Sequence, residues 1–233
     1  MLAQIDTRGR AVYNKSIMTR AARRKKGKSG NDDGRNDRCG ARACACARAG
    51  CRLIAIDGMC GSGKSTLGQR LAEALGGNLL HMDDFFLTAA QRTPERLAQV
   101  GGNVDYERFE RTVLRPLLAG VAFSYRPFDC AKGALAAAVQ VAPRPVTVVE
   151  GAYSLHPYFA DPWDVRLFVE TPPDVQQARI LARNGAKMLD RFVREWIPME
   201  NQYFSQCALR NHCDRVLTSG GMEEARGTGR REG

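Results

Sequence analysis

The stretch that decides the fold is DGMCGSGKST at residues 57–66, where a run of glycines comes directly before Lys-Ser-Thr. It follows RLIAI (52–56), a short apolar and β-branched run that is typical of a buried strand. It precedes TLGQRLAEAL (66–75), whose leucines recur every fourth residue on one helical face, and two glycines then end the pattern. The sequence therefore predicts a strand, a glycine loop and a helix in succession.

The spacing Gly58-x4-Gly63-Lys64-Ser65 is that of the Walker A phosphate-binding loop, and it lies between the expected strand and helix. Glycines let successive backbone N–H groups turn toward phosphate oxygens, and the helix adds the positive end of its dipole. Lys64 is predicted to reach the β- and γ-phosphates, and the Ser65 hydroxyl is predicted to bind Mg²⁺. We therefore predict an ATP-binding loop. The residues assigned to it are Gly58, Gly61, Ser62, Gly63, Lys64, Ser65 and Thr66.

The formal net charge of +10 belongs to one end of the chain. Residues 1–52 carry 14 Lys or Arg against 4 Asp, whereas residues 53–233 carry 21 charges of each sign. A polynucleotide groove would itself be basic, so nucleic-acid binding is expected at most through the N-terminal segment. No apolar run approaches the roughly 18 residues of a membrane helix, and no membrane partner is expected.

The N-terminal segment 1–52 is predicted to be a basic disordered tail, because it has few apolar side chains to bury. The cysteines of this segment are Cys39, Cys44, Cys46 and Cys51. Their spacing contains no Cys-x2-Cys pair, which argues against a zinc site. The other cysteines suggest no disulfide framework, so reduced thiols and a cytoplasmic location are expected. A polar C-terminal tail is predicted at 219–233.

Residues 53–218 are predicted to form one domain in which short apolar strands alternate with helices. The expected strands are 53–56, 78–82, 121–125, 146–149, 165–169 and 215–218. The expected helices are 66–75, one starting at Pro94, 106–119 with Asp105 as its cap and a bend at Pro116, 173–183, and about 188–209 with an interruption near Pro198. Such alternation predicts an α/β protein with the P-loop NTPase fold, in which an open parallel sheet has helices on both faces.

Acidic residues come at the ends of two expected strands, at Asp83, Asp84 and Glu150. The carboxyl ends of parallel strands face the ligand crevice, so these carboxylates are expected near the triphosphate. At most one of the adjacent aspartates can face the γ-phosphate, where it would accept a proton from an attacking hydroxyl. Glu150 is predicted to bind Mg²⁺. The structural alternatives are aspartates that cap the next turn and a solvated Glu150.

Arg179 and Arg183 lie four residues apart in the helix expected at 173–183, and therefore on one face of it. Guanidinium groups placed in this way could hold the migrating phosphoryl charge from a closing lid. The alternative is an ordinary solvated helix face.

Five segments together resemble the uridine kinase family of P-loop kinases, over about residues 53–218. They are GMCGSGKST, MDDFF, VDYERFERTVLRPLLAG, YRPFDC and VVEGAYSLHP. The same group includes nicotinamide riboside kinase, phosphoribulokinase and bacterial pantothenate kinase. The resemblance implies an enzyme that uses ATP and Mg²⁺ to phosphorylate a hydroxyl group, with Asp83 as the base. It also implies substrate contacts from Asp105 and phosphate contacts from Arg179 and Arg183.

The sequence departs from the family pattern in the part that would bind a nucleobase. Phe86 stands where uridine kinases usually have tyrosine, and YRPFDC contains no histidine, which leaves Tyr125 or Phe128 to stack on a substrate. The leading hypothesis is a nucleoside kinase, with a vitamin or a sugar phosphate as the alternative acceptor. Two other hypotheses are a nucleotide-binding regulatory protein without turnover and a kinase of nucleic-acid ends. Lys64, Asp83 and Glu150 together favour catalysis, because a sensor needs no base.

Overall fold

The computed structural model describes residues 3–5, 11–13 and 52–219, and the chain divides into two units, residues 1–38 and 39–233. In the first unit, β1 (Ala3–Ile5) pairs antiparallel with β2 (Ala11–Tyr13). These two three-residue strands lie within the segment 1–52 that is predicted to be a tail. The remainder of the predicted tail, its four cysteines and residues 220–233 lie outside the described residues.

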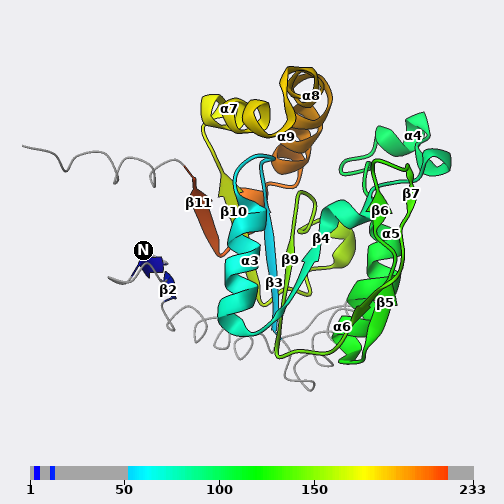
Figure 1. Cartoon of the computed structure of the whole chain (residues 1–233), viewed down its shortest axis with the longest axis vertical. Coiled ribbons are helices and arrows are strands. Elements are labelled where there is room, and N and C mark those ends of the chain that lie inside the picture. The colour runs from blue at the N-terminus through cyan, green and yellow to red at the C-terminus, as the bar shows by residue number, and fades with distance from the viewer. Residues whose placement is uncertain (1–2, 6–10, 14–51, 220–233) are drawn as a thin grey trace, which may run out of the picture. The chain divides into compact units, whose positions relative to one another are not determined.

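The second unit is built on a five-stranded parallel sheet (Figure 1). In spatial order its strands are β11 (Arg215–Thr218), β10 (Val165–Glu170), β3 (Arg52–Gly58), β9 (Val146–Glu150) and β4 (Asn78–His81). Every neighbouring pair is parallel, so the carboxyl ends of all five strands meet at one edge of the sheet. The predicted open parallel sheet is confirmed, with the strand before the glycine loop at its centre.

Both faces of the sheet are covered, as the burial of every residue from Leu53 to Gly58 requires. Helix α3 (Lys64–Leu75) packs against one face, in front of β3 in Figure 1. The opposite face carries the main apolar cluster, in which Leu53 and Phe168 meet aromatic side chains such as Phe109 and Tyr203. This arrangement fixes the glycine loop between a rigid strand and a packed helix.

The two long helical regions are continuous across their prolines. The first runs through α5 (Tyr106–Phe109), the π-helical turn η3 (Glu110–Leu114) and α6 (Arg115–Ala119). The second runs through α8 (Ala186–Arg191), the π-helical turn η5 (Phe192–Trp196) and α9 (Ile197–Gln206). In each, the residue before the proline donates its N–H to the carbonyl five residues back, Arg115 to Glu110 and Ile197 to Phe192. A wider turn accommodates a ring that has no N–H, so the expected bend and interruption become π-turns.

The caps of the first long helix agree with the sequence prediction. The Asp105 carboxylate accepts the Arg108 N–H at 2.9 Å, and Gly120 ends the helix in the left-handed conformation. The remaining helices of the described residues are α4 (Pro94–Leu97), α7 (Pro173–Asn184) and α10 (Leu209–His212). Short 3₁₀ turns occur at η1 (Met82–Phe85), η2 (Ala89–Gln91) and η4 (Pro157–Phe159).

The expectation that residues 121–125 form a strand of the parallel sheet is wrong. Only β5 (Phe123–Tyr125) forms, and it pairs antiparallel with β8 (Val139–Val141), outside the parallel sheet. Between them, β6 (Phe128–Asp129) pairs with β7 (Ala134–Leu135). These strands are only two or three residues long, which is short for a strand. They form a hairpin region beside α5 and α6, separate from the parallel sheet (Figure 1). Within the described ranges, no helix combines the length and the apolar character needed to cross a membrane.

Candidate active site

The glycine loop after β3 has the conformation that its glycines permit. Gly58 has φ of 133°, and a Cβ there would lie 2.0 Å from the carbonyl oxygen of Val169 on the neighbouring strand. Gly63 begins α3 with φ of 91°, and a Cβ there would project into open space. Gly58 is therefore required for packing between strands, whereas Gly63 is required for a left-handed backbone at the mouth of the loop.

The side chains of the loop divide into buried and exposed groups. Lys64 is buried, and its ammonium donates to the carbonyl of Met59 at 2.8 Å across the loop. The Ser62 hydroxyl is also buried and has no hydrogen-bond partner among the described residues. Ser65 and Thr66 are exposed in the first turn of α3. A cradle of backbone amides, one ammonium and two open hydroxyls fits a triphosphate, and the contacts assigned from sequence stay predictions.

The acidic residues expected beside the loop lie at the ends of β4 and β9, on the same edge of the sheet. Asp83 and Asp84 belong to the 3₁₀ turn η1, not to an extended strand as expected. The Asp84 carboxylate accepts the Tyr125 hydroxyl at 2.8 Å. The Asp83 carboxylate accepts no hydrogen bond within residues 52–219 and interacts electrostatically with Lys64 and Glu150. Of the two aspartates, Asp84 is thus engaged within the protein, whereas Asp83 is exposed and interacts electrostatically with Lys64.

The surroundings of Asp83 alter its acidity. Although the side chain keeps contact with solvent, desolvation by the surrounding protein raises the pKa of the Asp83 carboxyl above its ordinary value. The ammonium of Lys64 opposes this rise, and the negative charge of Glu150 adds to it. A raised pKa makes a carboxylate a better proton acceptor at neutral pH.

Glu150 ends β9 and meets His81, a residue that the sequence did not single out. The two side chains are 2.5 Å apart between Glu150 Oε1 and His81 Nδ1, and this hydrogen bond raises the pKa of His81. Glu150 is buried against α3 at Gly68, where a Cβ would lie 3.1 Å from its Cγ. A glycine inside α3 therefore lets the helix approach β9 and holds the carboxylate at the strand end.

The predicted Mg²⁺ ligands, Ser65 and Glu150, fit a metal that is shared with a nucleotide. In the described part of the chain, no group of three or more His, Cys, Asp or Glu side chains could hold a metal ion by itself. Mg²⁺ is usually bound through one or two carboxylates together with substrate phosphates, so a sparse protein ligand set suits it. Both ligands remain predictions.

The two arginines of α7 are placed differently. Arg179 Nη1 lies 3.5 Å from the carbonyl of Gly61 in the glycine loop and 2.9 Å from the Ser219 hydroxyl. Arg183 is exposed near the end of the helix, and its side chain bonds to Asn184. The structure therefore brings Arg179 to the loop and leaves Arg183 outside it.

Two of the residues expected to touch the acceptor, Asp105 and Tyr125, are engaged within the protein. The Asp105 carboxylate accepts the Gln91 side-chain amide at 2.8 Å and the guanidinium of Arg108 at 3.3 Å. Tyr125 is 6% exposed, and its ring stacks on Phe85 with 5.3 Å between centroids. The placement of Tyr125 speaks against the expected stacking on a substrate, because the face of its ring is already covered.

Three buried residues at the glycine loop were missed by sequence reasoning. Asp57 is fully buried and accepts hydrogen bonds from three backbone N–H groups and from the Tyr203 hydroxyl. Glu200 accepts the backbone N–H of Cys60 at 2.9 Å. The signals available were an acid inside an apolar strand and an acid three residues before a tyrosine in α9.

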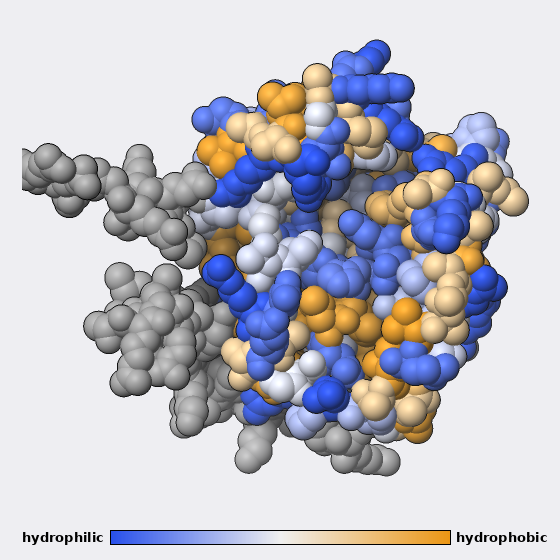
Figure 2. All heavy atoms as spheres, viewed as in Figure 1, coloured by the Kyte–Doolittle hydropathy of each residue, from blue (hydrophilic) through white to orange (hydrophobic). Residues whose placement is uncertain are grey.

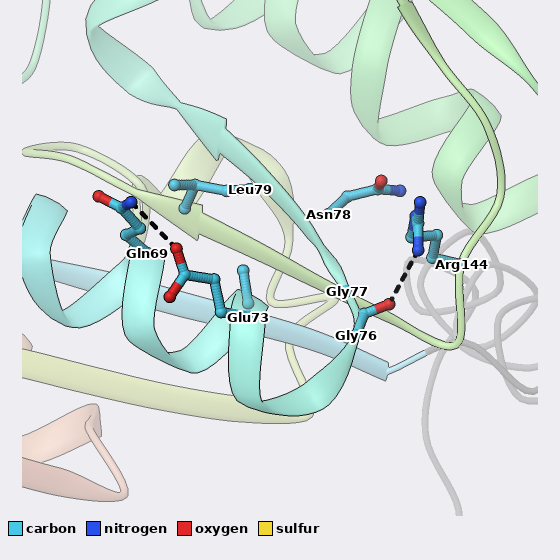
Figure 3. A pocket seen from close by; sticks show the side chains of 8 residues that line it. Gln69, Glu73, Gly76, Gly77, Asn78, Leu79 and Arg144 are labelled. Atoms are coloured by element: carbon cyan, nitrogen blue, oxygen red, sulfur yellow. Dashed lines mark hydrogen bonds between the residues drawn. The ribbon is translucent and has the colours of Figure 1, made fainter. Parts of the chain in front are cut away.

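One of the surface hollows lies away from this site. Figure 2 shows hydrophilic side chains in the recess between the α7–α9 helices and the α4–β7 side of the molecule. A separate hollow of about 470 Å³ lies at the opposite end of α3, between Gln69, Glu73, Asn78 and Arg144 (Figure 3). It is closed on one side by the bond from Arg144 to the Gly76 carbonyl. None of the predicted site residues lines it, so it is not the phosphate site.

Comparison with known proteins gives matches among kinases. The shikimate kinase family model matches residues 60–122. A uridine kinase of Deinococcus deserti is 26% identical over 189 residues, which is 74% of this chain and 89% of that enzyme. A shikimate kinase of Mycobacterium marinum is 42% identical over 62 residues, but these cover only 27% of this chain and 34% of that enzyme.

Two solved structures share the fold. A candidate fructose transport system kinase from Silicibacter sp. TM1040 is 24% identical with a TM-score of 0.56, and the match covers 77% of this chain and 98% of that one. A candidate uridine kinase from Bacillus stearothermophilus is 18% identical with a TM-score of 0.53, and the match covers 86% of this chain and 96% of that one. The predicted resemblance and the predicted fold class are confirmed.

Proposed function

We propose that this chain is a P-loop kinase that transfers the γ-phosphate of ATP to a hydroxyl group of a small molecule, with a nucleoside as the acceptor. The observation that carries the proposal is the free carboxylate of Asp83. Asp57, Asp84, Asp105, Glu150 and Glu200 all accept hydrogen bonds from within residues 52–219, whereas Asp83 accepts none there and faces Lys64. An unpartnered acid beside the phosphate loop is available for an acceptor hydroxyl.

Each group has one task in this reaction. The amides of the glycine loop and Lys64 hold the triphosphate. Asp83 takes the proton of the acceptor hydroxyl while the hydroxyl oxygen bonds to the γ-phosphorus, and the bond from that phosphorus to the β–γ bridging oxygen breaks so that ADP leaves. Arg179 is close enough to the loop to bind the transferred phosphoryl group, and Arg183 would have to arrive with a movement of α7. Ser65 and Glu150 would hold Mg²⁺, which supplies positive charge to the phosphates when bound.

A non-nucleoside acceptor is the second candidate, and the burial of Tyr125 favours it. One of the two rings available for stacking on a base is covered, which leaves Phe128 on β6, half-buried. The local match to shikimate kinase over residues 60–122 also includes the Asp83 turn and Asp105. The acceptor is therefore tested across nucleosides, vitamins, sugar phosphates and hydroxy acids.

The test measures ADP release from Mg-ATP with this acceptor panel in the wild type, Lys64→Ala and Arg70→Ala. Arg70 is exposed on the same helix and serves as the matched control. We expect an acceptor-dependent signal that Lys64→Ala abolishes and Arg70→Ala retains. Wild-type turnover that survives in a folded Lys64→Ala protein would contradict the kinase mechanism. ATP binding without any turnover across the panel would favour the regulatory alternative.

A further inference from the structure

Helix α9 touches the glycine loop through a buried carboxylate that the proposed reaction does not use. The Cys60 N–H donates to Glu200 Oε2 at 2.9 Å, over a separation of 140 residues in the chain. The Glu200 side chain is only 6% exposed. A buried carboxylate is costly unless it is paired, so this contact needs a physical explanation.

A second bond fixes the position of α9 at the same place. One turn after Glu200, the Tyr203 hydroxyl donates to Asp57 Oδ2 at 2.8 Å, at the strand end that begins the loop. The other side of Cys60 is occupied by Gln176 of α7, whose amide donates to the Cys60 carbonyl at 2.9 Å. Cys60 therefore lies between two helices, and Glu200 is not needed to attach α9 to the strand.

The charge of Glu200 is directed at the phosphate-binding groups. Burial raises the pKa of the Glu200 carboxyl, and the nearby ammonium of Lys64 lowers it. Glu200 thus occupies one backbone N–H of the loop and lies in the field of the Lys64 ammonium, which is predicted to bind the phosphates. Two anions that approach the same cation in a partly desolvated site repel each other.

We propose that Glu200 is an affinity-determining residue of the phosphate site: its carboxylate occupies the Cys60 N–H as an internal anion, and the terminal phosphate of the nucleotide displaces it. This inference rests on the proposed function for the identity of the ligand. The bond between Tyr203 and Asp57 keeps α9 attached when Glu200 leaves the loop. Removing the negative charge should consequently tighten nucleotide binding. A carboxylate that merely supports the loop would have the opposite effect, because its loss would weaken binding.

The test is calorimetric titration of Mg-ATP, and separately of inorganic tripolyphosphate, into the wild type, Glu200→Gln and Glu200→Met. Glutamine keeps an acceptor for the Cys60 N–H, whereas methionine keeps only the length of the side chain, so the pair separates charge from support. Glu195→Gln is the matched control, since Glu195 is exposed on η5 and pairs with Arg191. We expect both Glu200 variants to bind Mg-ATP and tripolyphosphate about tenfold more tightly than the wild type. The control should bind as the wild type does.

Circular dichroism and thermal unfolding show whether each Glu200 variant is folded. The nucleotide affinity of either folded variant, compared with that of the wild type, is enough to test the inference. Unchanged or weaker binding in a folded variant would overturn the inference. Equal binding of Mg-ATP by the wild type and Lys64→Ala would instead overturn the proposed function, whatever the Glu200 variants do. The two failures are therefore distinguishable.

Discussion

The substitution Asp57→Asn removes the charge around which the glycine loop, the segment after β9 and α9 are joined. Asp57 Oδ1 accepts the N–H groups of Gly58 and Tyr153 at 2.7 and 3.2 Å. Asp57 Oδ2 accepts the Leu155 N–H at 2.9 Å and the Tyr203 hydroxyl at 2.8 Å. Burial raises the pKa of this carboxyl, and the donors on both oxygens oppose the rise because they favour the ionised form.

An asparagine side chain has one oxygen, which can accept two of these four hydrogen bonds, and its NH₂ group must face the remaining two donors. The less costly orientation places NH₂ at Oδ2, where the Tyr203 hydroxyl can rotate to accept and only the Leu155 N–H loses its partner. A buried N–H without an acceptor costs about 1–3 kcal/mol. The loss of charge assistance in the remaining bonds adds about 1–2 kcal/mol, and relief from burying a charge offsets part of it. We expect the free energy of unfolding to fall by about 3 kcal/mol.

Urea unfolding followed by circular dichroism measures this loss. In a domain of this size, about 3 kcal/mol corresponds to a fall in Tm of roughly 6–12 °C. Tyr203→Phe is the matched comparison, because it removes one donor and leaves the backbone donors in place, and it should cost about 1 kcal/mol. An Asp57→Asn protein within about 0.5 kcal/mol of the wild type would refute the reasoning, as would a larger loss in Tyr203→Phe.

Two further predictions concern the proposed base and a half-buried histidine. Asp83→Asn should lower kcat by ~10²–10⁴ in single-turnover assays, with little change in ATP affinity. Asp84→Asn should lower kcat less, because the Asp84 carboxylate accepts the Tyr125 hydroxyl. A larger loss in Asp84→Asn would reverse the assignment of the base. Both ring nitrogens of His156 are engaged, by the Val100 carbonyl and the Tyr158 N–H, and burial lowers the pKa of the imidazole. The neutral imidazole should therefore stabilise the folded protein, and this contribution should be lost as pH falls below the pKa of about 6.5 that a histidine has in the unfolded chain. Urea midpoints at pH 7.5 and 5.5 should therefore differ more in the wild type than in His156→Gln, and equal differences would contradict this.

Local sequence patterns were sufficient for the elements that position the phosphate loop. The apolar run at β3, the glycine spacing and the leucine period of α3 each depend on residues within a few positions of one another. The strand at Arg215–Thr218 was predicted with the observed bounds, and the helix expected at 173–183 ends one residue later. The π-turns before Pro116 and Pro198 were not predicted, because a proline indicates disturbance of a helix without indicating how the backbone absorbs it.

The hairpin region shows a different limit. A period of alternating apolar residues identifies a strand but does not identify its partner, and β5 pairs with β8 instead of entering the sheet. The same holds for the side chains of the site. Asp57 and Tyr203 are 146 residues apart, and Cys60 and Glu200 are 140 apart, so no local pattern connects them. Sequence reasoning therefore found the residues of the loop and the helical region that includes α9, but it missed the contacts by which α9 holds the loop.

The acids of the site show which property separates a structural group from a reactive one. Sequence position placed Asp83 and Glu150 at the ends of two expected strands, and the family resemblance assigned a substrate contact to Asp105. In the structure, Asp105 is satisfied by Gln91 and Arg108, and Glu150 by His81, whereas Asp83 has no hydrogen-bond partner within residues 52–219. A carboxylate near Lys64 without an internal donor can exchange solvent for an acceptor hydroxyl at little cost, and a satisfied one must first break a bond. Hydrogen-bond satisfaction, which depends on distant residues, thus supports the proposal that Asp83 is the base.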